Sequence, residues 1–188
     1  MAEILTTVFF MFAVIDPIGT IPVYLEATKE FDIIHKKKIA IRASIMAFLI
    51  LLFFIVIGQI ILDGMEVSLD AFQISGGVIL FLFALTMIFG EGKPEQEKNR
   101  ITDYKHVTIF PIAIPSLASP GAIMAVVLMT NNQIYSIQEQ AITTFIVLIV
   151  IGITCLILLT ANYLQKLIGS YGITVLSKIM GLILASYA

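Results

Sequence analysis

The heptapeptide DPIGTIP, residues 16–22, interrupts an otherwise apolar stretch that runs from Ile4 to Ala27. Such a stretch can cross a membrane as a helix, because ~20 residues rising ~1.5 Å each span the ~30 Å of hydrocarbon. An acid and two prolines are costly there, since they leave a carboxyl group and broken backbone hydrogen bonds away from water. Irregular backbone at that depth is tolerated only where protein buries it or where it lines a watery cavity.

The composition of the whole chain indicates an integral membrane protein. Of 188 residues, 59% are hydrophobic and only 13% are charged, and the mean hydropathy is +1.03. A soluble fold of this length would expose too much apolar surface. Six apolar runs have the length of a membrane span: Ile4–Ala27, Ile39–Leu62, Ala71–Gly90, Thr108–Thr130, Ala141–Leu164, and Val175 to the end. No signal peptide is expected before them, because Glu3 stands where a basic region would be.

Several function classes are not expected from these residues. The lone Cys155 excludes an intramolecular disulfide and a two-thiol redox motif. An enzyme is not expected, because Asp16 is the only acid deep within a segment. The two histidines, His35 and His106, lie among charges in connecting loops, so we expect no catalytic residue, metal site or cofactor. The net charge of −2 gives no indication of a nucleic-acid partner.

The distribution of Lys and Arg predicts the orientation, because basic loops stay on the cytoplasmic side. Residues 29–42 and 90–107 are rich in Lys and Arg, whereas residues 63–70 and 131–140 contain neither. The first pair of loops is therefore predicted inside and the second pair outside. With six full crossings, both chain ends lie outside. An alternative remains, in which the first and fourth segments are re-entrant hairpins that return to their own side.

A weak internal repeat relates the two halves of the chain. A shift of 103 residues places Asp16-Pro17 on Ser119-Pro120 and the run from Ile39 on the run from Ile142. A register that slips by five residues instead pairs the two prolines of DPIGTIP with Pro115 and Pro120. The 103-residue shift is preferred because it needs no gap before the third segment.

The expected fold is an all-α membrane protein with six transmembrane segments, the first and fourth discontinuous at proline. Three segments per half is an odd number, so the second half must be inverted relative to the first. The predicted units are a first three-helix repeat at residues 1–90, a cytoplasmic linker at 91–107, and a second three-helix repeat at 108–188 with a short last helix.

Asp-Pro and Ser-Pro are both typical of helix starts. The side-chain oxygen accepts hydrogen bonds from free amides, and proline loses nothing at the first helical position. The half-helices that follow would present a positive dipole end near the midplane. For Asp16, capping alone and capping plus ligand binding are both open, whereas for Ser119 capping is favoured. The candidate substrate-binding residues are Asp16, Pro17, Gly19, Thr20, Ser119, Pro120, Gly121 and Ala122.

Four stretches of the chain resemble a known family. They are DPIGTIPVYL from Asp16, ISGGVILFLFALTMI from Ile74, FPIAIPSLASPGAI from Phe110 and MGLILAS from Met180. Together they resemble the MarC family of bacterial inner-membrane proteins. The resemblance implies a six-span, multi-pass protein of the cytoplasmic membrane that transports small neutral amino acids such as alanine and glycine. The chain departs from the family in carrying Asp16 where Asn is common, and in a last helix that stops at Ala188.

The expected function is therefore secondary transport, as uptake or export, of a small neutral amino acid bound near the midplane. The Asp16 carboxylate would face the ammonium group, and the free amides of the half-helices would face the carboxylate. Coupling to H⁺ or Na⁺ is left open, as is association into a homo-oligomer, and membrane lipid is an expected partner. The alternative is a passive channel or a non-transporting membrane regulator.

Overall fold

The structure is a computed structural model that describes residues 2–89 and 104–188, and this part of the chain contains helices but no strand. The elements are α1 (Ala2–Ile15), α2 (Thr20–Ala27), α3 (Ile33–Gly64), α4 (Leu69–Phe89), α5 (Tyr104–Val107), η1 (Thr108–Leu117), α6 (Pro120–Met129), α7 (Ile137–Leu159) and α8 (Ala161–Tyr187). The prediction of an all-α protein is confirmed for the described residues.

The lengths and hydropathy of these elements are those of membrane spans. Five segments of the described chain are long and apolar enough to cross a membrane, and one of them, Ile4–Ala27, covers most of α1 and all of α2. A sixth candidate is the pair Tyr104–Leu117 and Pro120–Met129, which is bent by 56°. Five or six candidate spans agree with an integral membrane protein that crosses the bilayer several times.

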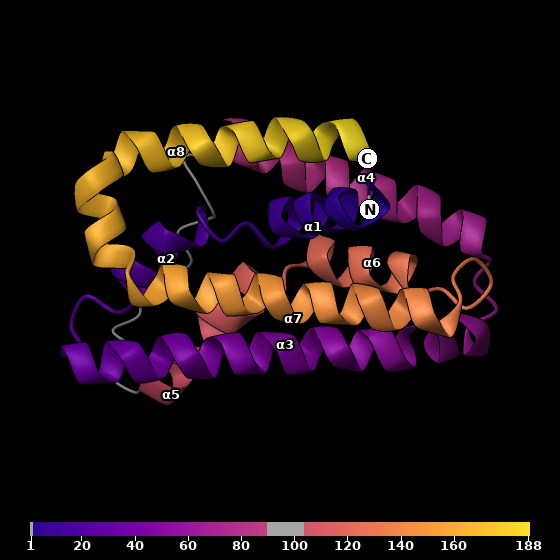
Figure 1. Ribbon diagram of the computed structural model, residues 1–188, viewed down its shortest axis with the longest axis horizontal. Helices are drawn as coiled ribbons and strands as arrows, with labels where there is room; N and C mark the ends of the chain where they lie inside the picture. Colours follow the sequence, from indigo (N-terminus) through magenta and orange to yellow (C-terminus); the bar gives the residue numbers. More distant parts are fainter. Residues whose placement is uncertain (1, 90–103) are drawn as a thin grey trace.

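The helices form an elongated bundle with the two broken segments in its middle (Figure 1). On one side α3 packs along α7, and on the other α4 packs along α8. Among the shorter elements, α1 contacts α6 and α2 contacts η1. The elements α1, α2 and α6 contact both of these pairs, and η1 contacts α3. In Figure 1, α1 and α2 follow one another along the bundle, as do η1 and α6, and the two chain termini lie near the same end.

Small residues allow the long helices to approach closely. A Cβ built on Gly181 of α8 would lie 2.8 Å from Met87 Cβ and 3.1 Å from Ala84 O of α4. A Cβ on Gly58 of α3 would lie 2.7 Å from a methyl carbon of Val127 in α6. Lipid is as apolar as the helices, so it supplies no hydrophobic driving force between them. Close van der Waals packing of this kind therefore holds the helices together. Large apolar side chains, in contrast, face outward toward the hydrocarbon, as in Phe9 with 69% of its surface exposed.

The predicted boundary between the last two segments was wrong. The fifth run was expected to continue to Leu164, but α7 ends at Leu159, and α8 begins at Ala161. Thr160 closes α7 because its backbone N–H donates to Leu156 O at 3.1 Å and its hydroxyl to the same oxygen at 2.9 Å. Residues 165–174, which separate the last two predicted runs, are helical, and α8 instead changes direction at Gly169, whose φ of 74° favours glycine.

The first part of the predicted linker at 91–107, residues 91–103, lies outside the described residues. The last four residues of this linker form α5. The inverted relation of the two halves and the three unit boundaries stay predictions.

Candidate functional site

The first break begins where Asp16 ends α1. Its backbone N–H still donates to Phe12 O at 3.0 Å, but its φ of 49° is in the left-handed region, which Asp tolerates better than most residues. Pro17 to Gly19 form a turn, and α2 begins at Thr20. The predicted start of the second half-helix at Pro17 was therefore three residues too early.

The Asp16 carboxyl group is buried and holds the break together. Its Oδ1 accepts a hydrogen bond from Gly19 N at 2.9 Å. Its Oδ2 accepts one from the hydroxyl of Ser177 in α8 at 3.1 Å. Thr20 adds a bond from its hydroxyl to Asp16 O at 2.9 Å. Only 1% of Asp16 is exposed, and it is the one carboxylic acid among the buried residues of the described chain.

Gly19 closes over this carboxyl group. A Cβ built on Gly19 would lie 1.9 Å from Asp16 Oδ2 and 2.7 Å from Ser177 Oγ. A side chain at Gly19 fits only if the Asp16 carboxylate and the Ser177 hydroxyl move away, because real Cβ atoms do not approach other heavy atoms so closely. Glycine therefore leaves room for this hydrogen-bonded arrangement, and the carboxyl group is enclosed in this conformation.

The second break lies between η1 and α6. Ser119 caps α6, because its hydroxyl oxygen accepts a hydrogen bond from Ala122 N at 3.0 Å, and Pro120 is the first residue of the helix. Upstream, the backbone of η1 leaves helical geometry at Phe110 and Ile114, each directly before a proline. Ser119 itself is 1% exposed. A buried helix start thus lies in the middle of the fourth segment.

The two breaks lie near one another in the bundle. A Cβ built on Gly121 would lie 3.7 Å from Val14 Cγ1, two residues before Asp16, and 3.2 Å from Leu80 Cδ2 of α4. Of the eight predicted binding residues, seven are buried: Asp16, Pro17, Gly19, Thr20, Ser119, Gly121 and Ala122. The eighth, Pro120, is exposed on the surface of the bundle. The contact made by Gly121 brings the start of α6 against the end of α1.

Ser177 was missed by the sequence analysis. It lies 161 residues from Asp16 in the chain, and only the packing of α8 brings the two together. The available signal was a hydroxyl group within the apolar run that begins at Val175.

A second polar group, also missed, lies where α6 ends. Asn131, only 1% exposed, donates to Gln59 Oε1 of α3 at 2.6 Å, and Gln59 donates in turn to Asp63 Oδ1 at 2.7 Å. Beside it, a groove of about 390 Å³ lies between α3 and α7. The groove is lined by Ile55, Val56, Gln59, Ile60, Asn132, Ile137, Gln140, Ala141 and Thr144. Within residues 2–89 and 104–188, no three His, Cys, Asp or Glu side chains are grouped as metal ligands would be.

Comparison with known proteins identifies the family. The family model described as "MarC family integral membrane protein" matches residues 1–188. The chain belongs to the MarC family. The predicted family resemblance is therefore confirmed over the whole length of the chain.

Curated MarC relatives occur in both bacteria and archaea. A UPF0056 membrane protein of Buchnera aphidicola is 32% identical, over 98% of this chain and 91% of the relative. A UPF0056 membrane protein of Methanocaldococcus jannaschii is 33% identical, over 95% of this chain and 88% of the relative. One of Pyrococcus horikoshii is also 33% identical, over 95% of this chain and 86% of the relative. These names describe a membrane protein and state no activity. No solved structure matches the chain.

Proposed function

We propose that this MarC protein is a secondary transporter of small neutral amino acids and that the substrate binds between the two helix breaks. The Asp16 carboxylate receives the ammonium group. The start of α6, where Gly121 packs against Val14 two residues before Asp16, receives the substrate carboxylate, because the N-terminal end of a helix carries a positive partial charge. Backbone and small side chains at Gly19, Gly121 and Ala122 restrict the substrate side chain to the size of that of alanine or glycine.

The observation that carries the proposal is the environment of Asp16. The carboxyl group is 1% exposed and has two neutral hydrogen-bond donors, while no basic side chain of the described residues bonds to it. A buried carboxylate without a positive partner is costly, so a bound cation beside it would be favourable. A substrate ammonium or a coupling ion, H⁺ or Na⁺, supplies that partner.

The contacts between helices support the inverted repeat that many transporters use. The second segments of the two halves, α3 and α7, pack together, as do the third segments, α4 and α8. The contact of α1 with α7 corresponds to those of η1 and α6 with α3. In the same way, the contact of α2 with α8 corresponds to that of α6 with α4. A two-fold axis between the breaks would relate each of these contacts in one half to its counterpart in the other half.

The enclosed carboxyl group indicates how access would be controlled. Gly19 and Ser177 cover Asp16 in this conformation, so a substrate reaches it only after the Ser177–Asp16 bond opens. Because Ser177 belongs to α8, movement of α8 together with α4 relative to α1 would expose the site. The structure then corresponds to an occluded state of the transport cycle.

Reconstitution into proteoliposomes tests the proposal. With labelled alanine or glycine inside, a transporter shows saturable exchange that unlabelled substrate on the opposite side accelerates, whereas a passive channel shows no such acceleration. In Asp16→Asn the amide oxygen still accepts from Gly19 N, so the fold is kept while the charge is lost. We expect this variant to exchange at least about tenfold more slowly, since losing one buried charge interaction is worth 1.4 kcal/mol or more.

The matched control is Asp70→Asn, which removes an exposed carboxylate near the start of α4. We expect it to exchange like the wild type. If Asp16→Asn exchanges normally at every pH, the carboxylate acts only as a helix cap. If the wild-type protein moves neither amino acid in either direction, the transport proposal is abandoned in favour of a non-transporting regulator.

A further inference from the structure

A row of hydrogen bonds joins the far end of α6 to α3. Asn131, two residues after α6 ends, donates from Nδ2 to Gln59 Oε1 at 2.6 Å, and Gln59 donates from Nε2 to Asp63 Oδ1 at 2.7 Å. The backbone N–H of Gln133 donates to Asn131 Oδ1 at 2.8 Å. Asn131 and Gln59 are 72 residues apart in the chain, so only the packing of α6 against α3 brings them together.

Both amides in this row have a defined orientation. A backbone N–H can only donate, so it fixes the oxygen of Asn131 toward Gln133. A carboxylate can only accept, so it fixes the nitrogen of Gln59 toward Asp63. The nitrogen of Asn131 and the oxygen of Gln59 then face one another as donor and acceptor. Because hydrogen bonds in a row polarise and strengthen one another, the three bonds act as one unit.

The same part of α6 packs closely against α3. A Cβ built on Gly58, next to Gln59, would lie 2.7 Å from a methyl carbon of Val127. Val127 precedes Asn131 by four residues, and the two are 5% and 1% exposed. Close packing and the Gln59–Asn131 bond therefore hold the last turn of α6 on α3 together.

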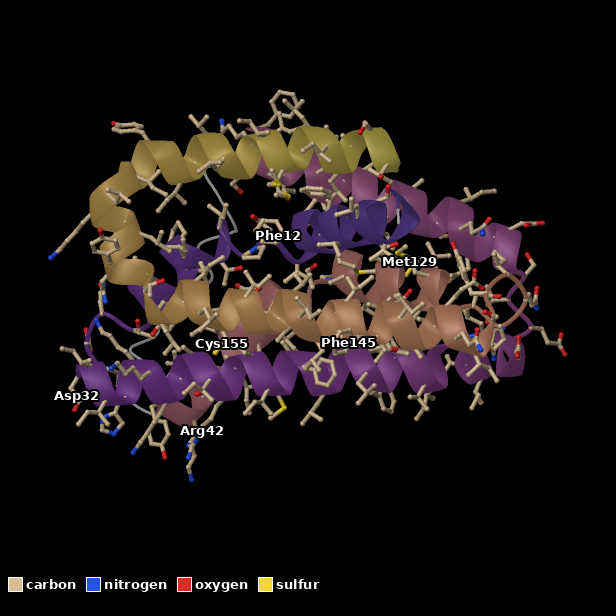
Figure 2. All side chains as sticks on the ribbon, viewed as in Figure 1. Phe12, Asp32, Arg42, Met129, Phe145 and Cys155 are labelled. Atoms are coloured by element: carbon tan, nitrogen blue, oxygen red, sulfur yellow. The ribbon has the colours of Figure 1, made fainter. Side chains whose placement is uncertain are left out.

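The helix α6 leads from the buried break to one end of the bundle. Its ten residues rise by ~15 Å, which is about half of the ~30 Å of hydrocarbon. In Figure 2, Met129 at the end of α6 and Asp32 before α3 lie toward opposite ends of the bundle. The Gln59–Asn131 bond thus lies at the end of the bundle away from the start of α3.

An open groove lies beside this bond. The side chain of Gln59 lines the groove between α3 and α7, together with Asn132 and Gln140, while its amide oxygen binds Asn131. Gln59 therefore stands between the groove and the end of α6. If Asn131 were released and α6 moved from α3, the groove would extend along α6 toward the break.

We propose that the Gln59–Asn131 hydrogen bond is a gate between this end of the bundle and the buried Asp16 site. When the bond is made, the end of α6 is held against α3 and the path from the groove is closed. When it breaks, water satisfies the two amides, so opening costs only the net free energy of a hydrogen bond and of the packing beside it. The role of this gate in transport rests on the proposed function.

Cysteine labelling tests the gate without any substrate. In a background with Cys155→Ser, a cysteine replaces Ala122 or Ala125, both fully buried in α6, and a membrane-impermeant thiol reagent is applied to intact cells or to inside-out vesicles. Gln59→Met keeps the side-chain length and removes the amide. It should accelerate labelling by at least about fivefold, the factor that one net hydrogen bond contributes. This acceleration should occur only from the face on which a cysteine at Asn132 reacts.

The matched control is Tyr24→Phe. The Tyr24 hydroxyl, in a side chain that is 2% exposed, donates to Lys36 O at 2.9 Å, so this variant also removes a hydrogen bond to α3, but near the start of that helix. Labelling from the Asn132 face should stay at the rate of the background. Equal acceleration by Tyr24→Phe and Gln59→Met would show general loosening around α3 and overturn the gate. So would no acceleration by Gln59→Met, or equal acceleration from both faces.

Melting temperatures in detergent show whether the variants fold. If Gln59→Met does not fold, Gln59→Asn, whose amide is one methylene shorter, is labelled in its place and judged in the same way. A chain that shows the expected labelling but moves no amino acid keeps the gate and loses the transport proposal. A chain that exchanges alanine without the labelling difference keeps the transport proposal and loses the gate.

Discussion

Asp16 combines two tasks that are usually separate in a membrane protein. Its Oδ1 satisfies the amide of Gly19 and so closes the turn, while its Oδ2 faces the Ser177 hydroxyl from another helix. An asparagine can perform the first task, but only a carboxylate provides a negative charge for the second. The same residue therefore closes the turn at the break and joins that turn to α8.

Replacing Gly19 by alanine tests how closely the turn encloses the carboxyl group. The added Cβ would lie 1.9 Å from Asp16 Oδ2, so the carboxylate has to leave its present position. Overpacking of this kind costs ~2 kcal/mol, which lowers the melting temperature of a chain of this size by ~4–8 °C. Thermal unfolding in detergent measures the difference.

Gly152→Ala is the matched control, since Gly152 lies within α7 and a Cβ there meets nothing within 4 Å. Alanine should leave the melting temperature unchanged or raise it, because it favours a helix over glycine by up to ~1 kcal/mol. Equal melting temperatures for Gly19→Ala and the wild type would mean that Asp16 does not occupy the described position in solution.

Among the elements, α6 shows most clearly how a helix can begin inside a membrane protein. Its ten residues are too few to cross the bilayer, and Gly121 and Ala122 in its first turn are buried. Ser119 Oγ satisfies Ala122 N, and Ser119 O accepts from Ile123 N at 2.9 Å. Local hydrogen bonds thereby replace those that water would make at an exposed helix start.

Ser119→Ala removes this cap and should destabilise the protein by ~1 kcal/mol. Ser119→Thr keeps a hydroxyl that can accept from Ala122 N, so it should retain most of the stability. The two variants and the wild type are compared by thermal unfolding in the same detergent. If alanine and threonine lower the melting temperature equally, the effect comes from packing around Ser119 and the cap has no energetic role.

The sequence predicted the spans better than the contacts between them. Hydrocarbon thickness fixes how many apolar residues a span needs, so the runs near α3, α4 and α7 could be located from composition. The start of α8 was missed because the polar residues after Thr160 continue as a helix that bends at Gly169. Ser119-Pro120 could be assigned as a helix start from two adjacent residues. Ser177 could not be assigned to Asp16, because their contact depends on how α8 packs.

At the scale of the whole molecule, the broken segments run along the bundle between two pairs of long helices. The chain termini and the connection between α6 and α7 lie toward one end, and the beginning of α3 lies toward the other (Figure 1). That arrangement favours full crossings, because a re-entrant first segment would bring the N-terminus back to the end where α3 begins. The Lys and Arg residues of 29–42 at that other end give the arrangement a predicted sidedness.

Cysteine accessibility tests both the crossings and the sidedness. In a background with Cys155→Ser, single cysteines replace Ala2, Asn132 or Lys37, and intact cells are treated with a membrane-impermeant thiol reagent. Full crossings predict that the cysteines at Ala2 and Asn132 react in intact cells, whereas the one at Lys37 reacts only after the cells are permeabilised. The physical reason is that Lys37 belongs to a basic segment, and such segments are predicted to stay in the cytoplasm.

Each other pattern has a distinct meaning. If the cysteines at Ala2 and Lys37 are both protected, the first segment returns to its own side as a hairpin, and α1 and α2 cannot lie in line across the bilayer. If the cysteine at Lys37 reacts while those at Ala2 and Asn132 are protected, the crossings are right and the orientation is reversed. Opposite behaviour of the cysteines at Ala2 and Asn132 would place two neighbouring ends of the bundle on different sides of the membrane. The antiparallel packing of α1 against α6, and with it the shared site between the breaks, would then be wrong.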